Sequence, residues 1–269
     1  MPLQNTSTGT GASLAMSARS ATIQSDVNLK SREALESFIA LGRYNSNIGR
    51  VVQDLRITLS AQEGYEAQAL RDVLRLTPNV ECLVLDLPSE APITLLNGLH
   101  FPKLRVLSTN LPHRVLISFI ANHGSLTSLA LRDCDSGPQA ACPLRGQELR
   151  HLEDLQCPSR CFAGIARGPL VTATVNLTRL TSVANLAIQT LSASHLHTLT
   201  VDCFSTDYDI LSRVSLAVPN LRKLKLIEKP QPHVCDVVFD PLTVSDQLSS
   251  ADKAMLGGLG TTSDRGTKL

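Results

Sequence analysis

Cysteine and histidine are the side chains of this chain that could ligate a metal ion, and one group of them is close together in the sequence. Cys157 and Cys161 are four positions apart, and His151 precedes them. A structural zinc ion needs four ligands at defined spacings, and no second cysteine pair or paired-histidine motif completes this set. The sequence therefore predicts no metal site.

His195 and His197 form a second such group, because they flank Leu196 on a predicted strand. Side chains two positions apart on a strand share a face, so the pair could bind a metal with the help of a third ligand. Since the sequence specifies no third ligand, we expect a partly exposed histidine pair at the start of a strand, and no cofactor.

The residues that enzymes need also do not form a motif here. The chain has no Gly-x-Ser-x-Gly, no phosphate-binding glycine loop followed by Lys-Ser/Thr and no His-Glu-x-x-His. The formal net charge is +1, which provides no bulk attraction for nucleic acid. We therefore expect neither catalytic residues nor a nucleic-acid partner.

The elements that must position these side chains follow from an internal repeat. Each unit has an apolar residue, two variable residues, a second apolar residue, one variable residue and a third apolar residue. The first apolar positions are 21–28 residues apart, which is typical of leucine-rich repeats of roughly 20–29 residues. These positions are Val52, Val80, Leu104, Leu126, Leu149, Leu170, Leu196 and Leu221.

The alternation of side chains along a strand assigns a direction to each position. The second and third apolar residues point into the core, and the variable residues beside them point out. Parallel strands each need a crossover. The predicted fold is therefore an α/β leucine-rich-repeat solenoid, a horseshoe with short parallel strands on the concave side and helices or irregular crossovers on the convex side.

Some positions depart from the pattern. Thr109 and Asp154 occupy the third, normally apolar position, and the leucines of segment 149–155 are three residues apart. Well-formed repeats have Asn or Cys eight residues after the first apolar position, and here Cys134 and Cys157 satisfy this rule. We therefore expect an irregular repeat around residue 154, and a structural role for both cysteines.

Helical spacing of apolar residues predicts helices within several crossovers. The helix predicted at 206–216 has Tyr208, Leu211 and Val214 on its apolar face. Segment 138–165, richer in Pro, Gly and Cys, is predicted to contain looser crossovers. The predicted crossover helices are at 63–76, 114–122 and 206–216.

The chain is predicted to have three parts. Residues 1–28 are expected to be disordered. Residues 29–233 form the repeat domain, with an N-terminal helical cap that Ser31 begins and Gly42 ends. Residues 234–269 are expected to contain a remnant of a C-terminal cap and a flexible tail.

Composition indicates the compartment. Hydrophobic residues make up 43% of the chain and aromatic residues 3%, so the core is expected to be aliphatic. The seven cysteines have no disulfide-framework spacing, and neither a signal sequence nor a run of about 18 apolar residues is present. We expect a cytoplasmic or nuclear protein without a membrane partner. A transit peptide in residues 1–25 is the alternative, since they contain Arg19 and no acidic residue.

Segments 76–88, 101–112, 125–134 and 218–228 resemble the irregular leucine-rich-repeat domains of fungal F-box proteins. The resemblance covers about residues 45–230 and implies a ribonuclease-inhibitor-like fold. In such proteins an F-box binds the Skp1 adaptor of a ubiquitin ligase, and the repeats recognise the substrate. No F-box is found in this sequence. The resemblance therefore implies a Skp1-type adaptor only if an F-box is missing from this chain.

The sequence thus predicts a protein–protein interaction module that binds an unidentified protein or peptide. Its narrower form is substrate recognition related to an F-box receptor, and the alternatives are a structural or regulatory scaffold or an ordinary solvated surface. His151 and Glu153 are assigned to the concave face in the irregular repeat. The predicted binding residues are Arg132, Thr172, Thr174, Thr198, Thr200, Asp202, Lys223 and Lys225.

Overall fold

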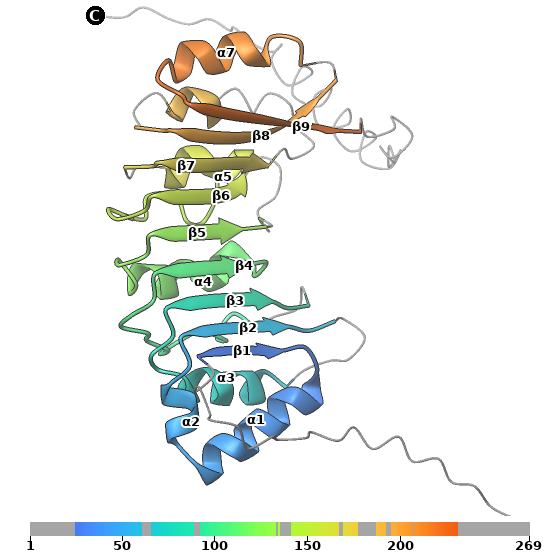
Figure 1. Ribbon diagram of the computed structural model, residues 1–269, viewed down its shortest axis with the longest axis vertical. Coiled ribbons are helices and arrows are strands. Elements are labelled where there is room, and N and C mark those ends of the chain that lie inside the picture. Colours follow the sequence, from blue (N-terminus) through green and yellow to red (C-terminus); the bar gives the residue numbers. More distant parts are fainter. Residues whose placement is uncertain are drawn as a thin grey trace, which may run out of the picture. The chain divides into compact units, whose positions relative to one another are not determined.

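The computed structural model shows a nine-stranded, entirely parallel β-sheet in which the order of strands follows the order of the chain (Figure 1). The strands are β1 (Asp26–Leu29), β2 (Asp54–Thr58), β3 (Cys82–Asp86), β4 (Val106–Thr109), β5 (Ser128–Leu131), β6 (Asp154–Pro158), β7 (Thr172–Asn176), β8 (Thr198–Phe204) and β9 (Lys223–Lys229). The structure describes residues 25–60, 66–88, 92–132, 134, 141–166, 169–176, 187–191, 195–205 and 207–230.

Alternating burial along the strands explains why this sequence forms a sheet. In β3, Leu83 and Leu85 are fully buried, and the residues between and beside them are partly exposed. The same two positions are stacked from strand to strand, so that Leu83 pairs with Leu107 and Leu107 with Leu129. The three offsets of the repeat therefore correctly predict strands β2–β5 and β7–β9 and the aliphatic core between the sheet and its crossovers.

The irregular repeat has a different register from the predicted one. Leu155, and not Leu152, pairs with Leu129, and the second buried side chain of β6 is Cys157. The leucines three residues apart fit both registers. The observed one buries the Cys157 thiol and leaves Asp154 on the other face, which avoids burying an unpaired carboxylate. Cys157 is thus a core residue within a strand.

The other misfit, Thr109, keeps its predicted inward position. It is 2% exposed, and its hydroxyl accepts a hydrogen bond from the Leu111 amide at 3.1 Å. A buried hydroxyl is tolerated when it is hydrogen-bonded, so Thr109 serves the turn that leaves the strand.

Crossover helices lie behind the sheet in the view of Figure 1, as α4 and α5 show most clearly. Each parallel strand must be joined to the next by a crossover, and crossovers of one hand lie on one face of a sheet. The helices are α1 (Arg32–Tyr44), α2 (Asn47–Arg50), α3 (Ala67–Leu76), α4 (His113–Ala121), α5 (Ser159–Ile165) and α7 (Ile210–Ala217). Helices α3, α4 and α7 confirm the three predicted crossover helices.

The predicted apolar face of α7 is wrong in part. Tyr208 and Leu211 are 88% and 57% exposed, whereas Ile210 and Val214 are buried. The helix begins at Ile210, so the buried stripe runs through positions 210 and 214, four residues apart. Tyr208 lies before the helix.

The N-terminal helix α1 forms as predicted, and the Ser31 hydroxyl caps it by accepting a hydrogen bond from the Ala34 amide at 3.2 Å. The prediction that Gly42 ends this helix is wrong, because α1 continues to Tyr44. A Cβ atom at Gly42 would lie 2.8 Å from Leu76 Cδ1. Glycine at this position therefore allows α1 to pack closely on α3.

The N-terminal end of the sheet differs from the predicted boundary. Strand β1 pairs with β2, so residues 26–28 are in a strand and not in a disordered segment. At the other end, Leu226 of β9 is 36% exposed. The predictions for residues 1–24 and 234–269, including the C-terminal cap, lie outside the described residues. No helix of the described part is long and apolar enough to cross a membrane.

Candidate functional site

The open face of the sheet is the first candidate site, and we call it the strand face. It consists of the side chains that point away from the core, and no helix of the described residues lies in front of β2–β9 in Figure 1. Its main polar patch is a group of threonines on β7 and β8. Thr172 pairs with Thr198, and Thr174 with Thr200. Neighbouring strands are about 4.7–4.9 Å apart, so four partly exposed hydroxyls form one patch.

Exposed lysines continue this patch onto the last strand. Lys223 and Lys225 are exposed and pair with the two threonines of β8. Asp202, by contrast, is only 6% exposed, and its carboxylate lies 3.6 Å from the Lys229 ammonium group. Asp202 lies within the part of β8 that pairs with β9, where its partner is Ile227. The prediction of an accessible Asp202 is therefore wrong.

Arg132 is on the same face, but an acidic residue neutralises part of its charge. Its guanidinium donates a hydrogen bond to the Asp86 carboxylate at 2.8 Å. Arg132 follows β5, and Asp86 ends β3, so the pair spans β4. An exposed ion pair stabilises the fold by only about 0–1 kcal/mol. Its main effect is to hold the arginine across the face.

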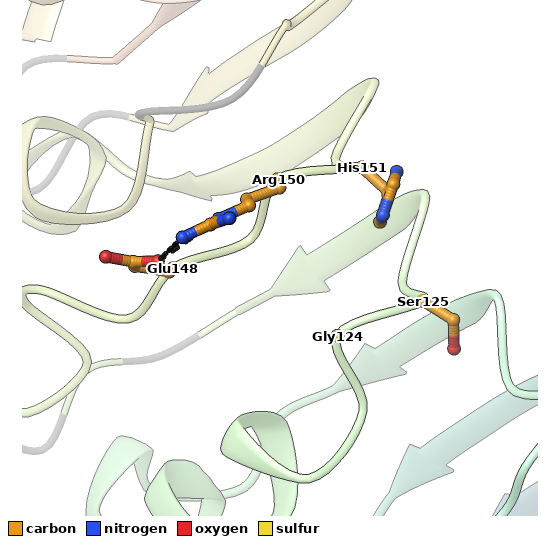
Figure 2. Close-up of a pocket in the computed structure, with 5 residues that line it drawn as sticks. All are labelled: Gly124, Ser125, Glu148, Arg150 and His151. Carbon is orange, nitrogen blue, oxygen red and sulfur yellow. Dashed lines mark hydrogen bonds and ion pairs between the residues drawn. The ribbon is translucent and has the colours of Figure 1, made fainter.

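A shallow hollow lies at the edge of the sheet where the strands begin (Figure 2). Its volume is about 350 Å³, and Figure 2 shows Arg150 pointing toward Glu148, with the two groups 2.7 Å apart. The shifted register of β6 places His151 and Glu153 before the strand, so they are not on the strand face as predicted. His151 lines the hollow with Gly124 and Ser125. The charges here pair with each other, which makes the hollow a weaker candidate.

The histidines and cysteines singled out in the sequence do not assemble as one group. His151 lies at the strand-start edge, Cys157 in the core, and His195 is exposed near the start of β8. Only Cys161 belongs to a potential ligand cluster among the described residues.

That cluster brings together side chains that are far apart in the sequence, and we call it the histidine–cysteine cluster. It consists of His113, Cys134, Cys142 and Cys161, whose nitrogen and sulfur atoms all lie within 4.8 Å of one another. Nδ1 of His113 is 3.1 Å from Sγ of Cys142 and 3.7 Å from Sγ of Cys161. Three of the four residues are buried, and Cys134 is partly exposed.

Hydrogen bonds within the cluster stabilise a thiolate. The Cys161 thiol, with a further contribution from His113, lowers the pKa of Cys142 to about 4 although burial opposes this. The same hydrogen bond, together with burial, raises the pKa of Cys161. On the strand face the effect is the opposite, because burial and the nearby Asp54 carboxylate raise the pKa of Cys82 to about 11. Cys82 is therefore a neutral thiol at pH 7.

The spacing of the four cluster residues matches no zinc motif, so the sequence did not indicate them as a set of metal ligands. The signal that was available is topological. His113 follows β4, Cys134 follows β5, and Cys161 follows β6 within a few residues. The carboxyl ends of parallel strands lie at one edge of a sheet, so residues after successive strands become neighbours.

Comparison of the chain with protein-family models, curated proteins and solved structures finds no match. The class that the structure itself defines is an α/β protein with one parallel sheet in chain order, an open strand face and a buried histidine–cysteine cluster.

Proposed function

We propose that this protein is a leucine-rich-repeat solenoid that binds a protein or peptide on its strand face. The observation that carries the proposal is the continuous row of outward polar side chains from β7 to β9. Across the three strands, Thr172 pairs with Thr198 and Thr198 with Lys223. The next row consists of Thr174, Thr200 and Lys225.

Such a row suits an extended partner. Hydroxyls can donate and accept hydrogen bonds, and lysines donate them and attract carboxylates. The sheet face is preformed, so binding orders few additional side chains and little conformational entropy is lost. A partner with acidic groups at one end of its contact segment would complement Lys223 and Lys225.

The narrower proposal is substrate recognition related to that of F-box receptors. It is supported by the repeat spacing and by the resemblance of segments 76–88 and 218–228, and it requires an adaptor-binding module that this sequence does not contain. A scaffold without a ligase role remains the alternative.

Arginine substitutions in the threonine patch test the binding face. We expect Thr174→Arg/Thr200→Arg to lower recovery of a specific partner about tenfold or more, because two long cations would block the threonine patch. Tagged wild-type and variant chains would be compared by affinity capture and quantitative mass spectrometry.

The matched control is Ser118→Arg, an equally drastic change at an exposed position of α4. A partner retained by this control and lost from the double variant supports the proposal. If every captured protein is recovered equally with all three chains, the strand face is not the binding surface and the scaffold alternative is favoured.

A further inference from the structure

We propose that His113, Cys134, Cys142 and Cys161 bind one zinc ion that joins three successive crossovers of the sheet. This inference concerns the interior of the fold and is independent of the proposed partner-binding face.

The donor set is the first argument. Three thiolates and one imidazole form a combination that occurs in structural zinc sites. Tetrahedral zinc with Zn–S of about 2.3 Å and Zn–N of about 2.0–2.1 Å requires donor atoms about 3.5–3.8 Å apart. The four donor atoms already lie within 4.8 Å of one another, and two of the distances are 3.1 and 3.7 Å. Small side-chain movements would therefore complete a tetrahedron.

Rigid elements hold two of the ligands. Pro112 and Pro158 are the N-cap residues of α4 and α5. Helix α5 begins directly after β6, and α4 begins four residues after the last residue of β4, so both helices start near the same edge of the sheet. His113 is the first residue of α4, and Cys161 is the third residue of α5. Buried apolar residues of both helices fix these positions in the core.

Close backbone packing holds the third ligand. The Gly146 amide donates a hydrogen bond to the Gly164 carbonyl at 3.3 Å, and the Arg145 amide donates one to the Cys142 carbonyl at 3.0 Å. A Cβ atom at Gly164 would lie 3.3 Å from Arg145 Cα. Glycine in α5 thus allows the turn that carries Cys142 to pack against the helix that carries Cys161.

The fourth ligand gives the metal access. Cys134 is partly exposed, whereas the other three residues are buried. An ion could therefore reach Cys134 from solvent and then the interior ligands, as a metal site requires.

A disulfide is the competing chemistry for three neighbouring sulfur atoms. It would join two of the sulfur atoms, and the third sulfur atom and the imidazole nitrogen would take no part in the bond. Zinc would use all four donor atoms. It would also compensate the negative charge of the three thiolates, two of which are buried in an interior that disfavours charge.

Zinc would act as a structural cross-link. His113 and Cys142 are 29 residues apart and His113 and Cys161 are 48 apart, so the ion would close long loops of the unfolded chain. The middle of the sheet, next to the threonine patch of the strand face, would be the part that it stabilises.

Metal analysis of the full-length chain tests the site. The protein would be purified under reducing conditions without chelator, and its zinc measured by inductively coupled plasma mass spectrometry. We expect about one zinc ion per chain. Replacement by Co²⁺ is expected to produce the visible absorption and thiolate-to-cobalt charge-transfer bands of a tetrahedral sulfur-rich site.

Variants at two partly exposed cysteines separate the cluster from nonspecific binding. Cys134→Ser should reduce zinc to well below half of an ion per chain, and Cys82→Ser, equally accessible but outside the cluster, should leave it unchanged. A strong chelator should lower the Tm of wild type and Cys82→Ser, and leave that of Cys134→Ser unchanged. This comparison does not depend on a buried variant that could fail to fold.

Three results would overturn the proposal. The first is a wild-type zinc content no higher than that of Cys134→Ser. The second is an equal loss of zinc in Cys82→Ser. The third is a zinc-free protein whose intact mass lacks two hydrogens, which would show a disulfide.

Discussion

His123 illustrates how one residue connects two crossovers of this fold. Its ring is almost fully buried. Nε2 accepts a hydrogen bond from the Phe101 amide at 2.9 Å, while Nδ1 lies 2.6 Å from the Phe119 carbonyl. These contacts require a neutral imidazole with its proton on Nδ1, because a protonated ring has no acceptor for the Phe101 amide.

Burial lowers the pKa of His123 below its ordinary value of 6.5. Above pH 6.5 the ring is neutral in both the folded and the unfolded chain. As the pH falls below 6.5, the unfolded chain takes up a proton before the folded chain does, so the free energy of unfolding decreases until the folded-state pKa is reached. The contribution of His123 is therefore complete at neutral pH and is lost under acidic conditions.

Replacement of His123 tests this pH dependence. We expect His123→Phe to lower the free energy of unfolding at pH 7 by about 1–3 kcal/mol, because the buried Phe101 amide loses its acceptor. The further decrease from pH 7 to pH 5 should be smaller in this variant than in wild type. Urea denaturation of wild type and variant at pH 7 and pH 5 measures this decrease in the free energy of unfolding. The exposed His195→Gln variant should behave as wild type, and an unchanged pH dependence in His123→Phe would refute the assignment.

At the scale of elements, α2 shows how a short helix is placed by a single glycine. A Cβ atom at Gly49 would lie 2.0 Å from the carbonyl oxygen of Leu76, at the end of α3. The atom that blocks the space belongs to the backbone and cannot rotate away. The N-terminal helices can therefore pack in this arrangement only without a side chain at residue 49.

Substitution of Gly49 is expected to be destabilising for this reason. Gly49→Ala should lower the free energy of unfolding by about 1–3 kcal/mol or more, as overpacking of a tight contact does. Gly124→Ala is the control, because a Cβ atom there meets nothing within 4 Å, and we expect a change within about 0.5 kcal/mol. The two variants would be compared with wild type by thermal unfolding, monitored by circular dichroism. Equal effects would show that the contact with Leu76 is not limiting.

At the scale of the whole sheet, each strand depends on its neighbours. An inner strand such as β5 buries its side chains between two flanking strands and the crossovers, whereas β9 has one partner strand among the described residues. A single repeat could not compensate the backbone entropy of about 1–2 kcal/mol per ordered residue, so stability comes from stacking.

Truncation of one leucine in an inner strand and one leucine in the last strand tests this dependence on position. Leu129 is 1% exposed and Leu226 is 36% exposed. We expect Leu129→Ala to lower the free energy of unfolding by about 2–5 kcal/mol, and Leu226→Ala by about 1 kcal/mol or less. Urea denaturation of both variants provides the comparison. Similar losses would mean that β9 is as well packed as the inner strands.

The sequence by itself determined strands β2–β5 and β7–β9 and their inward side chains, but it did not predict β1. Leu83, Leu129 and Leu199 are buried where the repeat predicts them, because alternation along a strand is a local property that successive residues specify. It also predicted the threonine rows, since parallel strands at equivalent repeat positions must be neighbours. Where local spacing fits two registers, as in the leucines before Cys157, the prediction was wrong.

Only the tertiary structure decided the meeting of His113, Cys134, Cys142 and Cys161, and the burial of Asp202. Neither depends on neighbours in the sequence. The cluster results from the lengths of three crossovers and from the packing of Gly164 on Arg145, and Asp202 is buried beside β9, with its carboxylate 3.6 Å from the Lys229 ammonium group. Contacts of this kind depend on how separate elements are stacked, and no periodicity within one element specifies them.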